Sequence, residues 1–339
     1  MLTRIMLTLD GASKSMSPSH ARSLLTGALA AFACTGAYAL DAGSYPSRPV
    51  RLIVPFSPGG GADQLARTLQ PGLTSSLGQS LVIDNRGGAS AVIGTDMAAR
   101  AAPDGHTLLL ITTTHTVTPT LLRKLPYDPV QDFSAITLAV TQPNILVVHP
   151  SVPAKSVKEL IALARTSKLT FASGGNGSQP HLGGELLKIV GDIDMTHVPY
   201  KGSGPGVAAV LGGQVTMMFV GPLAIEGHVR AGKLRALAVA DKKRSAILPD
   251  VPTAAEAGAA GIESGTWYGF LAPARTPQAI VAALHAHITN TMAVPEVKSR
   301  LLAQGTEIVG SGPREFAQLL RAEIAKWAKT VKRAGITPG

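Results

Sequence analysis

The sequence predicts an α/β fold with buried, largely parallel sheets. Short runs rich in Val, Ile and Leu, most of them flanked by Gly or Pro, alternate along the chain with amphipathic stretches of helical period. The runs are continuously apolar, which is typical of strands covered by helices on both faces. With 45% hydrophobic and 15% charged residues among 339, the chain has enough apolar material for a sizeable core.

The expected elements follow one another in a regular order. Strands are predicted at residues 50–56, 81–84, 107–112, 145–149, 169–172, 196–200, 215–219, 234–240 and 268–272. Helices are predicted at residues 63–77, 92–101, 156–164, 181–190, 205–211, 223–231, 277–292 and 313–331. Pro277 and Pro313 stand at the start of the last two helices, where proline is well tolerated.

The length suggests two domains, yet no Pro- or Gly-rich linker separates two halves of the chain. We therefore expect the chain to cross between the domains twice, at residues 140–146 (VTQPNIL) and 265–270 (GTWYGF). This divides the chain into a discontinuous lobe 1, residues 45–141 plus 266–339, and an inserted lobe 2, residues 142–265.

Residues 1–39 have the pattern of a secretory signal peptide. Basic residues precede an uncharged apolar run at 24–34, and a small-residue cleavage site of A-x-A form ends at Ala39. The run is too short to span a bilayer comfortably. Cleavage near Ala39 would place the protein in the periplasm. Lipid attachment at Cys34 is the alternative, although the residues before it match a lipobox poorly.

The composition of the mature chain excludes several functions. Three of the 31 basic and one of the 21 acidic residues lie in the signal peptide, so 28 and 20 remain and the net charge is +8. This positive charge mildly favours anionic ligands. The only cysteine is also in the signal peptide, and no HExxH or G-x-S-x-G motif is present, so we expect no catalytic residue, metal or cofactor. At 4% aromatic residues, nucleic acid is not an expected partner. The protein is expected to be soluble and monomeric.

A glycine-rich turn is the strongest local signal. In VPFSPGGGAD (54–63) a strand ends, three glycines form the loop and a helix begins. Such a turn points backbone N–H groups and a helix N-terminus into one cavity, which suits an anion. The Lys-Ser/Thr pair of a P-loop and the spacing of a dinucleotide fingerprint are both missing. Asp63 has two interpretations: it caps the helix, or it contacts the distal group of a ligand.

A second turn of the same kind, FASGGNGSQPH (171–181), lies in the other predicted lobe. The two turns could face each other across a cleft, each holding one end of an anionic molecule. The hydroxyls of residues 112–116 (TTTHT) follow another strand end in the same region, and Tyr200 ends a strand of lobe 2.

Six stretches, in order and covering almost the whole mature chain, resemble a known family. They are YPSRPVRLIVPFSPGGGAD (45–63), VIDNRGGASAVIGTDMAARAAPDGHTLL (82–109), FASGGNGSQPHLGGELL (171–187), HVPYKGSGPGVAAVLGGQV (197–215), GKLRALAVADKKRSAILPDVPTAAEAG (232–258) and WYGFLAP (267–273). Together they resemble the solute-binding proteins of tripartite tricarboxylate transporters, the Bug family. The resemblance implies a type II periplasmic binding protein, with two lobes each built on a mainly parallel sheet flanked by helices. It also implies a small carboxylate-bearing ligand held in the cleft between the lobes and delivered to membrane permease subunits.

The family pattern further implies which residues face the ligand. In lobe 1 they are Phe56, Ser57, Gly59, Gly60, Gly61 and Asp63. In lobe 2 they are Ser173, Gly175, Asn176, Gly177 and Tyr200, with Ser178 and His181 beside them. Ser90 and Thr112 are added as nearby hydroxyls.

Two segments depart from the family pattern. Gly87 replaces a common proline, and Ser90-Ala91-Val92 replaces a glycine-rich step, so that loop is bulkier and gains a hydroxyl. Val220 stands where the family commonly has an aspartate, which makes a ligand with an amino group less expected and mildly favours larger or aromatic carboxylates.

Two other functions remain open at this stage. A sensor subunit would use the same binding chemistry but present its closed form to a signalling kinase. An exported hydrolase would need a nucleophile–base pair that the sequence does not display.

Overall fold

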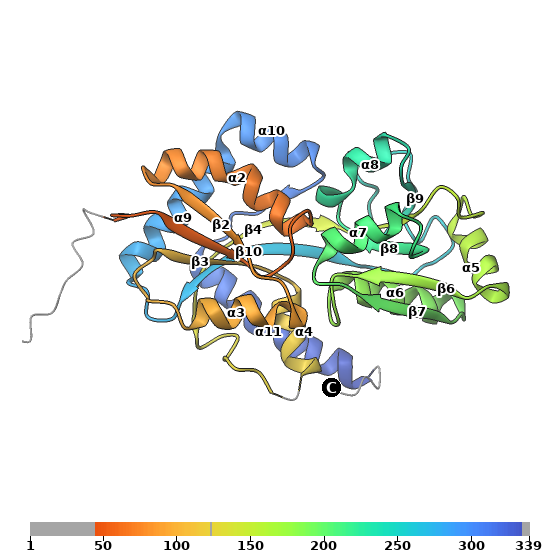
Figure 1. Cartoon of the computed structure of the whole chain (residues 1–339), viewed down its shortest axis with the longest axis horizontal. Helices are drawn as coiled ribbons and strands as arrows, with labels where there is room; N and C mark the ends of the chain where they lie inside the picture. The colour runs from red at the N-terminus through yellow and green to blue at the C-terminus, as the bar shows by residue number, and fades with distance from the viewer. Residues whose placement is uncertain (1–44, 123, 334–339) are drawn as a thin grey trace, which may run out of the picture. The chain divides into compact units, whose positions relative to one another are not determined.

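Two separate sheets organise the chain (Figure 1). The computed structural model describes residues 45–122 and 124–333, so the predicted signal peptide lies outside the described residues. The described residues form one compact unit. None of the helices in the described part is long and apolar enough to cross a bilayer.

The first sheet takes its strands from both ends of the described chain. In the order β11-β4-β10-β3-β1-β2, it contains β1 (Val50–Val54), β2 (Leu81–Asn85), β3 (Thr107–Thr112), β4 (Phe133–Pro143), β10 (Gly265–Pro273) and β11 (Glu307–Ile308). Strand β1 pairs in parallel with β2 and β3, whereas β10 runs antiparallel to both β3 and β4.

Alternate residues of β1 show how this sheet is covered. Leu52 and Val54 pack with buried residues of α2 (Gly61–Leu77), α9 (Gln278–Ala293) and α10 (Pro295–Ala303). Ile53 points to the opposite face, where α3 (Val92–Ala99) and α11 (Pro313–Arg333) contribute Ala98, Phe316 and Leu320. Figure 1 shows these helices in two layers, one on each side of the strands, with α4 (Thr114–Leu121) beside α11. Burial on both faces explains the continuously apolar strand sequence.

The second sheet is built from the segment between β4 and β10. In the order β7-β6-β8-β5-β9, it contains β5 (Ile145–Val148), β6 (Leu169–Ser173), β7 (Met195–Pro199), β8 (Met217–Val220) and β9 (Arg235–Val239). Its faces are covered by α5 (Val157–Thr166) and α6 (Gln179–Gly191) on one side and by α7 (Ser203–Leu211) and α8 (Glu226–Arg230) on the other.

The two passages of the chain between the sheets lie against each other. Asn144 is the single residue between β4 and β5, and Ser264 directly precedes β10. The backbone N–H of Asn144 donates to the carbonyl of Ser264 (2.8 Å), and the Asn144 side chain donates to the Ser264 hydroxyl (2.8 Å). The division of the chain into two lobes at residues 141/142 and 265/266 stays a prediction, as does the movement of the lobes relative to one another.

The α/β class predicted from the sequence is confirmed, but the sheets are mixed rather than mainly parallel. Antiparallel pairing in the first sheet follows from β10, which returns from the second sheet to lie between β3 and β4. The sequence also failed to indicate β4 as a long strand, β11, and the helices α4 and α10. Helix α4 has the sequence THTVTPTL, whose threonines and internal proline disfavour a helix, and it is stabilised instead by its burial.

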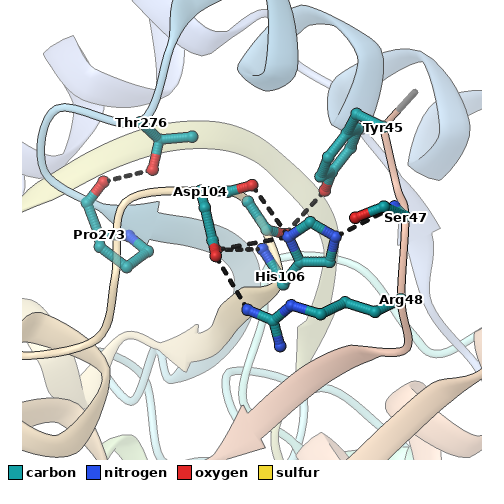
Figure 2. A network of polar contacts seen from close by, with 8 residues as sticks. Tyr45, Ser47, Arg48, Asp104, His106, Pro273 and Thr276 are labelled. Carbon is teal, nitrogen blue, oxygen red and sulfur yellow. Dashed lines mark hydrogen bonds and ion pairs between the residues drawn. The ribbon is translucent and has the colours of Figure 1, made fainter. Parts of the chain in front are cut away.

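The start of the described chain is tied down by side chains (Figure 2). The Tyr45 hydroxyl donates to the carbonyl of Gly105 (2.7 Å), and Arg48 forms an ion pair with Asp104 (2.9 Å). Between them, the N–H of Ser47 donates to Nε2 of His106 (3.3 Å). These contacts fix the segment that enters β1 against the loop that enters β3, so the neighbouring strands begin from one anchored point.

Candidate functional site

The first glycine-rich turn connects β1 to α2 as predicted. Helix α2 begins at Gly61, its N-cap residue Gly60 is in extended conformation, and no side chain caps it. The space around Gly61 is closed, because a Cβ there would lie 2.3 Å from the Tyr268 hydroxyl oxygen. Only glycine therefore allows the α2 N-terminus to approach β10 this closely.

Asp63 holds this turn together. Its carboxylate accepts hydrogen bonds from the N–H of Gly59 (3.0 Å) and from Arg67 (2.9 Å), and its side chain is buried. Burial alone would raise the pKa of Asp63, but the hydrogen bonds from Arg67 and Gly59 outweigh it and lower the pKa. The carboxylate therefore stays ionised within the turn. Asp63 does not cap α2, because Gly60 is the N-cap residue and the N–H of Gly59 lies before the helix; a contact of Asp63 with a ligand stays a prediction.

Three further helices of the described chain begin at the same place. Helix α4 follows Thr113, α6 follows Ser178 and α7 follows Gly202, and none of their N-cap residues makes a side-chain hydrogen bond to the helix. Helices α2 and α4 come from the first sheet, and α6 and α7 from the second. The first N–H groups of a helix have no partner inside it and carry partial positive charge. Four such ends close together can stabilise a bound anion.

The loops of the two sheets touch directly. The N–H of Ser57 donates to the carbonyl of Lys201 (2.9 Å), and the N–H of Gly61 donates to the Ser203 hydroxyl (3.4 Å). Gly204 fits so tightly that a Cβ there would lie 2.3 Å from the carbonyl oxygen of Pro58. The structure thus holds the two sheets in a closed arrangement at this edge.

A cavity of about 50 Å³ lies where the four helices begin. At about 10–15 Å³ per water, this is room for a few water molecules. Its lining residues are Phe56, Gly60, Gly61, Ala62, Thr112, Thr113, Thr114, Asn144, Gly174, Ser178, Gln179, Pro180, Ser203, Val220, Gly221, Ala224, Thr266 and Tyr268. They supply hydroxyls, amides and backbone N–H groups, but no acidic or basic side chain.

The two chain crossings form one wall of the cavity. The Thr266 hydroxyl donates to the side-chain oxygen of Asn144 (3.2 Å), and the Gln142 side-chain amide donates to the Tyr268 hydroxyl (2.6 Å). Both pairs join β10 to β4 or to the residue after it. The polar wall is thereby held at the point where the two sheets meet.

The structure brings together only part of the set predicted from the sequence. Phe56, Gly60, Gly61, Thr112 and Ser178 line the cavity. The other predicted residues are not among its lining residues: Ser57, Gly59, Asp63, Ser90, Ser173, Gly175, Asn176, Gly177, His181 and Tyr200. Whether any of these fifteen contacts a ligand stays a prediction.

Several of the residues outside the lining shape the second glycine-rich turn. Gly175 and Gly177 have positive φ angles of 123° and 75°, and the Ser178 hydroxyl donates to the carbonyl of Gly175 (2.8 Å). The N–H of Gly177 donates to Nδ1 of His181 (3.2 Å). Gly175 also approaches Ser90 of the other sheet, since a Cβ there would lie 3.4 Å from the Ser90 hydroxyl. Asn176 is exposed.

Ser173 and His197 form a pair that the sequence did not reveal. The Ser173 Oγ lies 2.6 Å from Nε2 of His197 and also accepts from the N–H of Gly175 (3.1 Å). Burial, with help from the neighbouring His181 and Lys188, lowers the pKa of His197 to about 4. Ser173 is fully buried outside the cavity lining, so this pair supports the turn and presents no nucleophile to the cavity.

Sequence reasoning did not select several of the lining residues. Asn144, Thr266 and Tyr268 lie on the two segments predicted as crossings, and a cleft at the crossings would have pointed to them. Gln179 lies in the second glycine-rich turn but was not selected, and no local signal marks Ala224. In the described part of the chain, no cluster of three or more His, Cys, Asp or Glu side chains could hold a metal ion.

Comparisons with known proteins agree on one family. Residues 65–336 match the model of the tripartite tricarboxylate transporter family receptor. Protein BugT of Bordetella pertussis is 38% identical over 300 residues, which cover 87% of this chain and 92% of that protein.

Two solved structures from Rhodopseudomonas palustris have the same fold. Rpa4515, solved with adipate, is 37% identical to this chain with a TM-score of 0.83, and the match covers 87% of this chain and 100% of Rpa4515. MatC, solved with bound malate, is 35% identical to this chain with a TM-score of 0.80, and the match covers 85% of this chain and 100% of MatC. The fold is therefore that of the periplasmic binding proteins, and the chain, which is similar to the Bug proteins, belongs to the tripartite tricarboxylate transporter family of receptors.

Proposed function

We propose that this protein is an extracytoplasmic receptor that binds a small carboxylate between its two lobes and delivers it to a tripartite tricarboxylate-type membrane transporter. The observation that carries the proposal is the convergence of four helix N-termini, none capped by the side chain of its own N-cap residue, on a cavity lined by no charged side chain. Backbone N–H groups and hydroxyls at such ends stabilise negative charge. They can do so without an ion pair.

Neutral binding suits a receptor that must release its ligand. A buried ion pair requires both charges to be desolvated, and breaking it leaves one charge unpaired. Helix ends contribute about 0.3–1 kcal/mol each for an anion at exposed sites, and up to about 2 kcal/mol where partly buried. A carboxylate held this way is bound firmly when the helix ends surround it and loosely when two of them move away.

Closure follows from the division of the helix ends between the two sheets. In the proposed mechanism, an acid first meets the N-termini of α2 and α4 on lobe 1 and then draws in those of α6 and α7 on lobe 2. The bond from Ser57 to Lys201 and the contact of Gly61 with Ser203 form in the closed state. Because these contacts and the ligand stabilise the same state, the ligand shifts the population toward it. The closed shape is what the permease recognises.

The cavity favours acids without an amino group. An ammonium group buried there would meet no carboxylate, since Asp63 is paired with Arg67 and Val220 is apolar. Malate and adipate, found in the two similar structures, are aliphatic diacids of this kind. We therefore propose short aliphatic dicarboxylates as the first candidate ligands. The protein would bind them in the periplasm.

A thermal-shift screen of the purified protein tests the proposal. The acids are succinate, malate, adipate, citrate, benzoate and phthalate, with aspartate as the aminated match for succinate and adipamide as the neutral match for adipate. A ligand at 100 times its Kd stabilises the fold by about 2.7 kcal/mol. The proposal expects a shift for at least one acid, none for adipamide, and recovery of the acid unchanged. No shift for any acid, or conversion of the acid to a product, would contradict it.

A further inference from the structure

The hydroxyl of Tyr268 is a buried polar group at the cavity whose hydrogen has no acceptor in the described chain. Tyr268 lies in β10, its side chain is 4% exposed, and it lines the cavity. Its only hydrogen bond is the one it accepts from Nε2 of Gln142 at 2.6 Å. A phenol can donate as well as accept.

The orientation of the Gln142 amide follows from a backbone contact. The N–H of Leu223 donates to Oε1 of Gln142 (3.3 Å), so this end of the amide must be the carbonyl oxygen. The NH₂ group then faces Tyr268, and the phenol oxygen must accept. Gly221 makes this packing possible, because a Cβ there would lie 1.9 Å from Nε2 of Gln142. With the oxygen engaged by Gln142, the phenol hydrogen turns elsewhere.

The phenol oxygen lies beside the N-terminus of α2. A Cβ on Gly61, the first residue of α2, would lie 2.3 Å from the Tyr268 oxygen, so the hydroxyl sits at the N-terminus of that helix. A carboxylate held by the α2 N–H groups would be within reach of the phenol. Burial also raises the pKa of Tyr268, which keeps the phenol protonated and able to donate.

We propose that Tyr268 donates a hydrogen bond to a carboxylate bound at the α2 N-terminus, and that Gln142 acts as a positioning residue that directs this donor toward the ligand. The inference rests on the proposed receptor function and assigns it a specificity-determining pair. A phenol donor of fixed direction needs an acceptor on the ligand: either oxygen of a carboxylate can accept, whereas an amide can offer only its carbonyl oxygen.

Two variants and a control test the pair, with Kd measured by calorimetry for malate and adipate. Tyr268→Phe removes the donor and should weaken binding about 10- to 100-fold, the usual effect of losing a hydrogen bond to a charged group. Tyr127→Phe removes another buried phenol, one that packs with His115 and Phe133 and is not among the cavity-lining residues, and it should leave Kd within twofold of wild type.

Gln142→Glu redirects the phenol hydrogen, and the double variant Tyr268→Phe/Gln142→Glu shows how much of its effect comes from charge repulsion alone. The new carboxylate would accept the phenol hydrogen and repel the ligand, so binding should weaken at pH 8 at least as much as in Tyr268→Phe. Near pH 5 a buried carboxyl is largely protonated. The ratio of variant to wild-type Kd, measured for the same acid at each pH, should therefore fall several-fold between pH 8 and pH 5.

The outcomes distinguish this inference from the receptor function. If the wild type binds malate or adipate but Tyr268→Phe binds as tightly, or the Gln142→Glu ratio does not change with pH, the Tyr268–Gln142 pair has no such role. If Tyr268→Phe does not fold, the pH dependence of Gln142→Glu decides. If the wild type binds neither these nor any other acid of the screen, the proposed function itself is wrong.

Discussion

Gly204→Ala should prevent full closure of the protein without damaging its fold. A Cβ at residue 204 would lie 2.3 Å from the carbonyl oxygen of Pro58 and 2.8 Å from the backbone nitrogen of Gly60. Both are backbone atoms, so neither can turn aside. Carbon–oxygen contacts are comfortable only from about 3.3 Å, so the two loops must separate by roughly 1 Å.

That separation sets the size of the effect. A shift of about 1 Å breaks the bond from Ser57 to Lys201, now 2.9 Å, and the contact of Gly61 with Ser203, now 3.4 Å, because both would exceed hydrogen-bonding distance. Each is worth about 0.5–1.5 kcal/mol, so the closed state loses about 1–3 kcal/mol. Because ligand binding depends on that state, Kd should rise about 5- to 150-fold.

Calorimetry with the best acid of the screen gives the Kd, and thermal unfolding without ligand reports on the fold. Alanine at residue 204 suits helix α7, so the midpoint of the unliganded protein should not fall. Gly227→Ala in α8 is the matched control, since a Cβ there meets no atom within 4 Å. Wild-type affinity in Gly204→Ala would refute the role of loop contact in binding.

Three further predictions concern the cavity charge, the pH dependence and the packing. Val220→Asp adds a carboxylate to the cavity wall and should raise the Kd for acids at least about tenfold at pH 8. Affinity should recover in part at pH 5, because the buried carboxyl is then protonated. Calorimetry at the two pH values checks both results. Burial lowers the pKa of His115 to about 4, below its unfolded value of about 6.5, so its stabilising contribution is complete above pH 6.5 and is lost as the pH falls toward 4. Urea unfolding should show the wild type losing up to about 3 kcal/mol more than His115→Gln over that range; equal losses would contradict it. Gly184→Ala places a Cβ 2.2 Å from the Phe171 ring and should lower the free energy of unfolding by about 1–3 kcal/mol in urea; no loss would mean the ring can move aside.

The site residues that could be predicted are those whose sequence pattern lies within a few consecutive residues. The turn at Gly60 and Gly61 was evident because the end of a strand, a run of glycines and the start of a helix are adjacent in sequence. Asn144 and Tyr268, by contrast, reach the cavity only because β10 pairs with β4 across more than a hundred residues. That pairing depends on tertiary packing, which no short pattern records.

The same distinction explains the errors in the fold. The strands near Leu52 and Phe171 were predicted because buried strands have a distinctive apolar sequence. The antiparallel neighbours of β10 depend on where the chain returns, which the strand sequence itself does not encode. Helix α4 was missed because Pro119 and its threonines oppose a helix that only its surroundings stabilise.

A crystal structure of the protein with the acid that binds best tests the central claim most directly. The account predicts a carboxylate whose oxygens lie about 2.7–3.2 Å from the first N–H groups of α2 and from hydroxyls of both sheets, with no lysine or arginine in contact. An acid bound to basic side chains outside the cavity, or in the cavity without contact to the helix N-termini, would contradict it.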